Sequence, residues 1–338
     1  MTLYYRPLVQ TGPAMPPGAA PLAGGWGWFT TLEVLERGGA PRFIDASDLP
    51  TDVADRLCTP RPAIAGLDLA EPRVMGILNA TPDSFSDGGR HERAGDAVKG
   101  GLAMIAQGVD LLDVGGESTR PGSAAVPVEE EIARVVPVIA GLRAAGAECV
   151  ISIDTRKMAV ARVAAQAGAD LVNDVAGFAF DPALAPFCAE AGLPVCVMHA
   201  QGEPETMQRD PRYDDVVLDV YDHLAERIAA LEAAGIDRAR IIADPGIGFG
   251  KTQAHNLALL GRLGLFHGLG VPLLLGASRK RFIGTIGGAP EARDRGPGSI
   301  GVALAGLAQG VQFLRVHDVG ETIQAIKLWR AAMAGSIS

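Results

Sequence analysis

The sequence contains few cysteines, few aromatic residues and no excess of positive charge. Its 338 residues include four cysteines, and their spacing shows no Cys-x-x-Cys or other metal-ligand pattern. Aromatic residues make up 5% of the chain, and the formal net charge is −9. Such a charge disfavours general binding to nucleic acids or acidic membranes. Any site for an anion must therefore be a local cluster of basic side chains.

Signals for export and for membrane insertion are also missing. The first residues contain no charged segment followed by an apolar core and a small-residue cleavage site, so no signal peptide is predicted. The long uncharged run 296–314 is broken by Gly, Ser and Gln, which indicates a buried core helix rather than a membrane span. Cys149 and Cys196 lie in apolar runs typical of buried, reduced thiols. We therefore expect a cytoplasmic protein.

Two nucleotide-binding motifs fail in the stretch DPGIGFGKT at 244–252. Pro245 stands where a phosphate-binding loop requires its first glycine. Lys251 stands where the dinucleotide fingerprint Gly-x-Gly-x-x-Gly requires its last glycine. An acid, a Pro-Gly break, a flexible loop and a lysine in this order must serve another purpose.

From residue 73 onward, eight short apolar runs alternate with longer segments of helical period, several of which end in glycine. Val-, Ile- and Leu-rich strands that alternate with helices predict a parallel sheet buried on both faces. Eight such units in about 265 residues match an α/β fold of the closed (β/α)₈ TIM barrel type, whose usual size is about 250 residues. The alternative is a doubly wound open sheet, which normally has fewer strands and a glycine fingerprint.

Residues 1–71 do not share this repeat, and we assign them to an N-terminal extension whose role is not legible. The catalytic barrel would then span 72–338. The extension contains four prolines between 13 and 21, followed by WGWFTTLEVLERGG at 26–39, for which we predict one short helix.

Polar residues occur at or near the end of every predicted strand, where a barrel builds its active site. Singly, each has a structural explanation. We favour helix capping for Asp174 and Asp318, His199 alone fits a core histidine, and Lys251 and Arg279 fit solvated side chains. Asp113, in mid-strand, fits a buried hydrogen-bonding group. Structural roles do not readily explain why four polar residues on nearby strands would point at one central pocket. These residues are Asp154, Asn173, Asp244 and Lys280.

Two chemical zones follow from this arrangement. Acids and amides near 154, 173 and 244 suit a flat, amino-bearing heterocycle, because a carboxylate accepts two parallel N–H bonds from a guanidine-like edge. The second zone suits an anion, since barrel phosphate sites commonly use the loops after the last strands. Its members are Asn79, Thr119, Arg120, Arg315 and His317.

Long ordered motifs resemble those of the dihydropteroate synthase family. They are MGILNATPDSFSDGG (75–89), DLLDVGGESTRPG (110–122), DPGIGFGK (244–251), GASRKRFIG (276–284) and RVHDV (315–319). The resemblance implies a barrel enzyme that joins 6-hydroxymethyl-7,8-dihydropterin pyrophosphate to p-aminobenzoate, releasing pyrophosphate and forming 7,8-dihydropteroate for folate biosynthesis. It also implies Mg²⁺, a homodimer and inhibition by sulfonamides.

The same resemblance implies roles for particular residues. Catalysis would fall to Asp154, Lys280 and Arg315. The pterin would contact Asp154, Asn173, Met198, Asp244 and Lys280. The p-aminobenzoate would contact Thr119, Arg120, Pro121, Phe249 and Arg281. Pyrophosphate would contact Asn79, Thr119, Arg315 and His317, with Asn79 also on the metal.

Two departures from the family stand out: Arg281 replaces a frequent serine, and MHAQGEP at 198–204 replaces MHMQGTP. Two alternatives remain. A pterin-dependent methyltransferase barrel shares the pterin residues but does not need the anion zone. A non-catalytic pterin-binding protein would be expected to have lost Asn79, Arg120 or Arg315, and all three are present.

Overall fold

The computed structural model of the chain describes residues 2–80, 90–118, 125–202 and 206–336. Eight parallel strands of this part form one sheet in the order β12-β11-β10-β9-β8-β7-β14-β13. They are β7 (Arg73–Asn79), β8 (Leu111–Gly115), β9 (Val150–Asp154), β10 (Leu171–Asp174), β11 (Val195–Met198), β12 (Ile241–Asp244), β13 (Leu274–Leu275) and β14 (Phe313–Val316). The sheet's two outer strands meet through a parallel bridge between Ala243 and Leu273. The predicted (β/α)₈ barrel is therefore confirmed in a nearly closed form, and the open doubly wound sheet is wrong.

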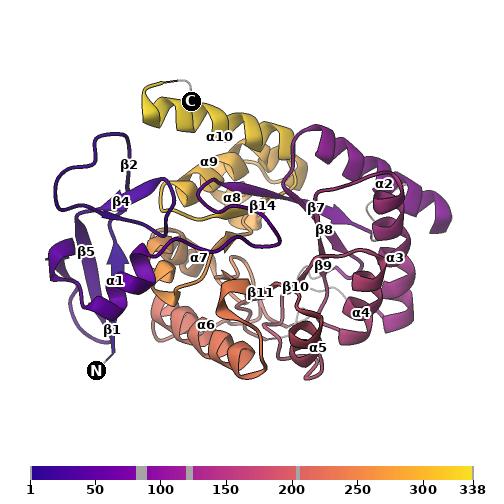
Figure 1. Ribbon diagram of the computed structural model, residues 1–338, viewed down its shortest axis with the longest axis horizontal. Helices are drawn as coiled ribbons and strands as arrows, with labels where there is room; N and C mark the ends of the chain where they lie inside the picture. The colour runs from indigo at the N-terminus through magenta and orange to yellow at the C-terminus, as the bar shows by residue number, and fades with distance from the viewer. Residues whose placement is uncertain (1, 81–89, 119–124, 203–205, 337–338) are drawn as a thin grey trace.

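Helices form the outer layer around these strands (Figure 1). They are α2 (Arg90–Ala106), α3 (Val128–Ala144), α4 (Met158–Ala167), α5 (Leu184–Ala191), α6 (Val216–Ala233), α7 (Gln253–Leu260), α8 (Arg281–Gly287), α9 (Gly296–Leu307) and α10 (Val319–Ala334), with 3₁₀ turns η3 (Arg238–Arg240), η4 (Leu263–Leu269) and η5 (Ala292–Arg295). The uncharged run 296–314 supplies α9 and the start of β14. Within the described residues, no helix has both the length and the apolar character needed to cross a membrane.

The inside of the barrel is layered. Near the N-terminal ends of the strands it is apolar, and each barrel strand contributes one side chain: Met75, Leu111, Val150, Leu171, Cys196, Ile242, Leu274 and Phe313. Ile64 and Leu69, which precede β7 in the chain, belong to the same buried apolar cluster. Because side chains alternate along a strand, the residue two positions further on also points inward. In several strands that residue is polar, and the inner face changes from apolar to polar towards the C-terminal ends.

The N-terminal extension forms two small antiparallel sheets, ordered β1-β5-β6 and β2-β4-β3, and one short helix. Their bounds are β1 (Leu3–Pro7), β2 (Gln10–Thr11), β3 (Ala20–Pro21), β4 (Gly27–Phe29), β5 (Thr31–Glu36), β6 (Arg42–Asp45), η1 (Ala46–Asp48) and α1 (Thr51–Cys58). The predicted helix within 26–39 is therefore wrong, since β4 and β5 occupy that segment. Pairing of β5 with β1 and β6 on its two sides outweighs the helical propensity of its Leu and Glu residues.

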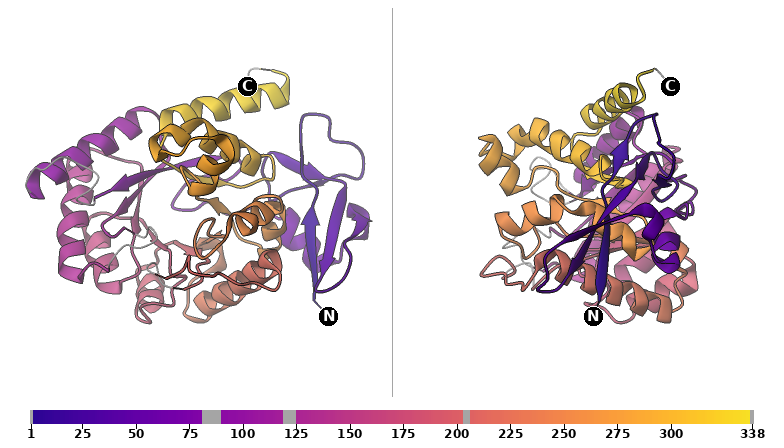
Figure 2. Two further views of the ribbon diagram at one scale, coloured as in Figure 1. Left: turned by 180° about the vertical axis from the view of Figure 1, so that it is seen from behind. Right: turned by 90° about the vertical axis from the view of Figure 1, so that its left-hand side faces the viewer.

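The extension packs against one side of the barrel, beside α6 and η4 (Figures 1 and 2). Tyr4 donates its hydroxyl to the Asp222 carboxylate of α6 at 2.9 Å. Glu33 is 5% exposed and receives hydrogen bonds from Arg6 within the extension and from Arg262 of the barrel, at 2.8 and 3.0 Å. A charged carboxylate shared in this way couples the extension to the barrel.

Candidate active site

The strand ends place the predicted pterin residues side by side. Asn173 pairs in register with Asp154, and Met198 pairs with Asp244. Asp154 lies four residues beyond Val150 of the apolar layer, and Asp244 lies two beyond Ile242, so both carboxylates point inward. All four of these strand-end residues are less than 10% exposed. The structure therefore brings these four predicted residues together above the apolar layer.

Arg315 lies at the centre of this polar layer. Its Nε donates to Asp113 Oδ2 at 2.6 Å, and its Nη2 donates to Asp154 Oδ2 at 2.9 Å. Asn173 Nδ2 also donates to Asp113 Oδ2, at 3.0 Å. Asp113 is fully buried, as its mid-strand position predicted. One guanidinium thus links β8, β9 and β14 across the barrel, and Arg315, a member of the predicted anion zone, contacts Asp154 of the predicted pterin zone.

Burial dominates the electrostatics of the layer. It raises the pKa of Asp154 above its usual range, and the neighbouring Asp113 carboxylate adds to this effect while Arg315 opposes it. Burial likewise raises the pKa of Asp244, against the lowering effect of Lys280. The Lys280 pKa falls to about 7, because burial of its amine outweighs the attraction of Asp244. Such desolvated acids and amines gain from a ligand that hydrogen-bonds to them, and perturbed groups of this kind are typical of functional sites.

The loop DPGIGFGK surrounds Lys280, which explains its glycines. The amine of Lys280 donates to Ile247 O and lies 4.2 Å from the centre of the Phe249 ring. A Cβ on Gly248 would come within 2.8 Å of the Lys280 side chain. Gly246 has a φ of +68°, and a Cβ there would lie 1.8 Å from His199 O. Both positions therefore require glycine so that the loop can pack against its neighbours.

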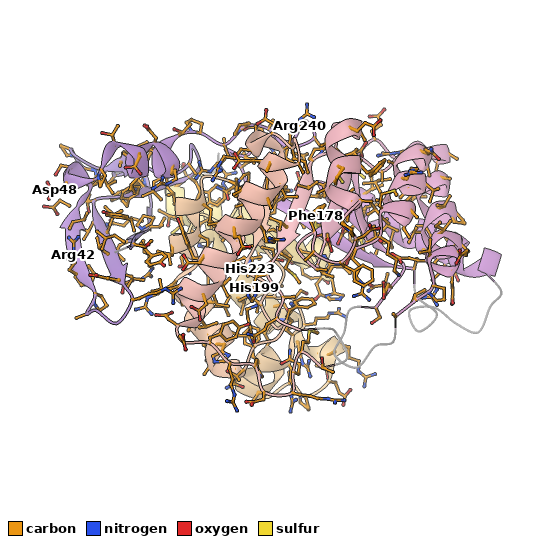
Figure 3. All side chains as sticks on the ribbon, turned by 90° about the horizontal axis from the view of Figure 1, so that it is seen from below. Arg42, Asp48, Phe178, His199, His223 and Arg240 are labelled. Atoms are coloured by element: carbon orange, nitrogen blue, oxygen red, sulfur yellow. The ribbon has the colours of Figure 1, made fainter. Side chains whose placement is uncertain are left out.

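Lys251 is 3% exposed, so the expectation of a solvated side chain is wrong. Its amine lies 2.8 Å from His199 Nδ1 and donates to Phe249 O at 3.0 Å. Burial, and then the charge of Lys251, lower the pKa of His199 to about 2, which keeps the imidazole neutral. His199 also meets His223 of α6 edge to face, with ring centres 4.7 Å apart (Figure 3). Lys251 thus ties the end of β11 to the loop after β12.

The predicted anion zone is only partly described. Asn79 ends β7 and is partly exposed, and His317 Nδ1 lies 3.0 Å from Ser278 Oγ. Arg281 is exposed at the first position of α8, and Phe249 is partly buried. Thr119, Arg120 and Pro121 lie outside the described residues.

Asp174 and Asp318 were expected to cap helices, and they act differently. Asp174 accepts hydrogen bonds from the backbone N–H groups of Ala176 and Phe178, both at 2.7 Å, so it closes the turn after β10. Asp318 makes no side-chain cap for α10 and instead pairs with Arg279, which is therefore not merely solvated. Both aspartates have structural partners, as expected.

A buried ion cluster beside the site was missed by the sequence analysis. Lys157 donates to Glu117 at 2.8 Å, to Glu131 at 2.6 Å and to Val126 O at 2.6 Å. Glu131 is fully buried although it belongs to an acidic run at the start of α3, where exposed charges are usual. Its buried contacts with Lys157 and with the Thr155 hydroxyl distinguish it, and no spacing in the sequence indicates those contacts.

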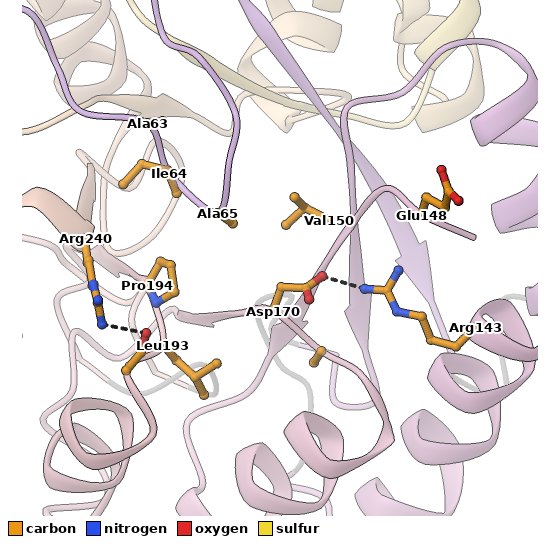
Figure 4. A pocket seen from close by; sticks show the side chains of 12 residues that line it. Ala63, Ile64, Ala65, Arg143, Glu148, Val150, Asp170, Leu193, Pro194 and Arg240 are labelled. Carbon is orange, nitrogen blue, oxygen red and sulfur yellow. Dashed lines mark hydrogen bonds and ion pairs between the residues drawn. The ribbon is translucent and has the colours of Figure 1, made fainter. Parts of the chain in front are cut away.

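A cavity of about 560 Å³ lies at the opposite end of the barrel, beside the segment 63–65 and the first residues of β9 and β11 (Figure 4). Arg143 and Arg240 border it, and both are hydrogen-bonded to protein groups. Arg143 pairs with Asp170 at 2.5 Å, and Arg240 donates to Gly192 O at 2.8 Å. The polar strand ends are remote from this cavity, and it is not the candidate active site.

Comparisons with known proteins agree with the geometry. The model of a family described as pterin binding enzyme matches residues 75–317. The dihydropteroate synthase of Escherichia coli K12 is 48% identical over 268 residues, covering 79% of this chain and 94% of that protein. Solved structures of the Xanthomonas albilineans dihydropteroate synthase are also similar. The one with 4-aminobenzoic acid is 48% identical with a TM-score of 0.76, covering 81% of this chain and 98% of that one. The one with 7,8-dihydropteroate is 46% identical with a TM-score of 0.74, covering 81% and 99%. The chain therefore belongs to the pterin-binding enzymes and, within them, to the dihydropteroate synthases, which are transferases.

Proposed function

We propose that the polar layer binds the pterin of 6-hydroxymethyl-7,8-dihydropterin pyrophosphate through Asp154, Asn173, Met198, Asp244 and Lys280. The observation that carries this proposal is the convergence of desolvated carboxylates from β9 and β12 on one inward-facing surface. A pterin edge presents adjacent N–H donors, which a carboxylate accepts as a pair. The Xanthomonas albilineans enzyme has been solved in complex with 7,8-dihydropteroate, which contains the same ring system.

Pyrophosphate would lie next to this layer, against Asn79, Arg315 and His317, with Thr119 as a further contact. Arg315 remains charged because Asp113 and Asp154 raise its pKa, in spite of its burial. Its guanidinium adjoins the pterin zone through Asp154 and the anion zone through β14. A fixed positive charge between the two zones would bind the substrate at the bond that breaks.

The residues present are compatible with Mg²⁺. Among the described residues, no three His, Cys, Asp or Glu side chains form a group that could hold a metal. Mg²⁺ does not need such a group, because it usually keeps several waters and binds one or two protein oxygens together with substrate phosphates. The amide oxygen of Asn79 at the end of β7 would supply that protein ligand. The ion would neutralise charge on the departing pyrophosphate.

The reaction we infer is a dissociative alkyl transfer. The bond between the pterin methylene carbon and the pyrophosphate oxygen breaks, and the oxygen keeps the electron pair. Asp154, whose charged form is favoured by the ion pair with Arg315 against its burial, would stabilise the positive charge that develops on the pterin-methyl group; a carboxylate about 4 Å away contributes roughly 4 kcal/mol at an effective dielectric near 20. The p-aminobenzoate nitrogen then attacks the carbon and loses a proton. An aromatic amine is neutral at pH 7, so no strong general base is required.

The p-aminobenzoate would bind at the outer edge of the site, against Phe249 and Arg281 and with Thr119, Arg120 and Pro121. Phe249 is suited to this role because its ring lies beside the Lys280 amine and is partly exposed. The Xanthomonas albilineans enzyme has been solved with 4-aminobenzoic acid. We also propose a homodimer in the cytoplasm, with 1–71 as an accessory unit and 72–338 as the catalytic unit.

Ordered binding tests this assignment of neighbouring zones. We expect p-aminobenzoate to bind appreciably only when pyrophosphate already occupies its site, because pyrophosphate forms part of the inner wall of the p-aminobenzoate pocket. Titration calorimetry with p-aminobenzoate, with and without pyrophosphate and Mg²⁺, measures this directly. Equal affinity under both conditions would show that the zones are independent and would reject the arrangement.

A further inference from the structure

Arg279 has an unusual backbone conformation for its residue type. Its φ is +57°, in the left-handed region that glycine adopts readily and residues with long side chains avoid. It stands between Ser278, which contacts His317, and Lys280, which contacts the loop after β12. Residues held in this region often lie at functional sites, where the surrounding structure imposes the conformation. The contacts of Arg279 with its neighbours show how the structure imposes this conformation.

The side chain and the backbone of Arg279 are both held in place. Its Nε donates to Asp318 Oδ2 at 3.1 Å and its Nη2 donates to Oδ1, which is a two-point contact between guanidinium and carboxylate. Its backbone N–H donates to Ser299 Oγ at 2.8 Å. Its carbonyl accepts from Arg295 Nη1 at 3.0 Å. Arg279 is therefore fixed by three separate elements: the residues after β14, α9 and η5.

The left-handed turn sends successive side chains in opposite directions. Arg279 points towards Asp318, whereas Lys280 points into the site, where its amine reaches Ile247 O. Residues 278–280 do not belong to a strand, because β13 ends at Leu275 and α8 begins at Arg281. The direction of Lys280 thus depends on this turn and not on the pleat of a strand.

We propose that Arg279, through its paired contact with Asp318, is a positioning residue that aims Lys280 into the pterin site. The proposal rests on the function proposed above, because it assigns no new chemistry to Arg279. Asp318 directly follows His317, and His317 is joined to Ser278 by its own hydrogen bonds. The residues 278–279 and 317–318 therefore form two adjacent cross-links, with Lys280 on one side and the anion zone on the other.

Two substitutions remove the side-chain contact of Arg279 while its left-handed backbone conformation stays accessible. Arg279→Gly keeps the left-handed conformation accessible and removes the contact with Asp318. Arg279→Asn also tolerates this conformation, and it provides a second variant if glycine makes the segment too flexible to fold. We expect kcat/KM for dihydropterin pyrophosphate to fall about 10²-fold in each, the scale of a misplaced catalytic group.

The decisive measurement repeats Arg279→Gly in a Lys280→Ala background. If Arg279 acts through Lys280, the substitution causes no further loss of kcat/KM there. An equal loss in both backgrounds would mean that Arg279 acts independently of Lys280 and would overturn the proposal, as would an unchanged kcat/KM in both single variants. Asp318→Asn should resemble Arg279→Gly. Asp110→Asn weakens a comparable pair with Arg73 at the other end of the barrel and should leave kcat/KM unchanged.

The two proposals fail in different ways. A wild-type protein that makes no dihydropteroate contradicts the proposed function. Calorimetry with 7,8-dihydropterin then still tests the positioning role, because the expected loss of affinity in Arg279→Gly and its absence in the Lys280→Ala background do not depend on turnover. Equal dihydropterin affinity in wild type and Arg279→Gly would overturn the positioning role in that case.

Discussion

At the scale of single residues, Lys251 and Lys280 show that the surroundings of a lysine determine its role. Both are lysines close to Asp244, and burial lowers the pKa of both. Lys280 is partly exposed at the site, whereas Lys251 is enclosed by His199 and the backbone of its own loop. The first therefore suits contact with a ligand, and the second holds the loop.

The charge of Asp154 is expected to matter more than its shape. Asp154→Asn keeps the volume and some hydrogen bonding, and it removes the carboxylate that we propose to stabilise the developing positive charge. We expect kcat to fall by about 10²-fold or more, the scale of lost transition-state electrostatics, with a smaller loss of pterin affinity. Steady-state kinetics measure the first effect and calorimetry the second.

Asp174→Asn is the matched control, because Asp174 ends the neighbouring strand and is equally buried but bonds only to backbone N–H groups. It should lower stability and leave kcat near the wild-type value. Unchanged kcat in Asp154→Asn would instead give Asp154 a structural role.

Arg281 is the residue at which the chain departs from the frequent serine of its family. Its side chain is exposed at the start of α8. It either offers a charged fork to the p-aminobenzoate carboxylate or points to solvent while backbone groups bind. If the fork is used, Arg281→Ala raises KM for p-aminobenzoate about tenfold, or roughly 1.4 kcal/mol, with no change for the pterin substrate. An unchanged KM for p-aminobenzoate would assign Arg281 to solvent.

The sequence predicted inward-facing residues better than it predicted their partners. Asp154, Asn173 and Asp244 were found because strand ends in a barrel converge, which follows from topology alone. The burial of Lys251 and Glu131 was not predicted, because it depends on contacts between segments far apart in the chain. The same holds for the left-handed turn at Arg279, which no residue type in SRKR indicates.

At the scale of elements, β5 shows that the local sequence pattern alone does not determine secondary structure. TLEVLE contains good helix formers, and it became a strand because β1 and β6 pair with both of its edges. The loop after β12 is the opposite case, since its glycines are required by contacts with His199 and Lys280. Its unusual sequence indicated that this loop has a special role, but only the structure shows the contacts that require its glycines.

Glu33 of β5 should contribute to stability and not to catalysis. Its carboxylate joins Arg6 of β1 to Arg262 of the barrel, and it is nearly buried. Glu33→Ala leaves both arginines without this partner, and we expect it to lower the free energy of unfolding by about 2 kcal/mol, as for charged hydrogen bonds. Urea denaturation measures this effect, and kcat should not change.

Glu226→Ala serves as the comparison, because Glu226 pairs with Arg227 on the surface with its side chain 72% exposed. Its effect should stay below about 0.5 kcal/mol. Equal effects of the two substitutions would mean that the extension is not coupled to the barrel through Glu33.

At the scale of the whole molecule, buried histidines should make the fold sensitive to acid. His267 lies in η4, is fully buried, and has its pKa lowered to about 3 by burial and then by Arg61. The unfolded chain takes up this proton near pH 6.5 and the folded chain only near 3. The free energy of unfolding therefore falls as the pH drops between these values, by about 1.4 kcal/mol per pH unit for each such group.

His267→Gln tests this effect and retains a side-chain amide that can donate to Gln309 O, as His267 Nε2 does at 2.9 Å. Between pH 6 and pH 4 the free energy of unfolding should fall less in the variant than in the wild type. The two slopes should differ by about 1.4 kcal/mol per pH unit, which corresponds to the uptake of one proton. Urea denaturation at several pH values gives the comparison. Parallel curves for the two proteins would show that His267 does not remain neutral in the folded state.

The central claim is that the polar layer at the strand ends joins a dihydropterin to p-aminobenzoate with release of pyrophosphate. The most direct test is to incubate the protein with dihydropterin pyrophosphate, p-aminobenzoate and Mg²⁺, and to measure pyrophosphate and 7,8-dihydropteroate together. We predict equal amounts of the two products in the wild type and a loss of both in Asp154→Asn. Absence of 7,8-dihydropteroate, or its formation at the same rate in Asp154→Asn, would contradict the account.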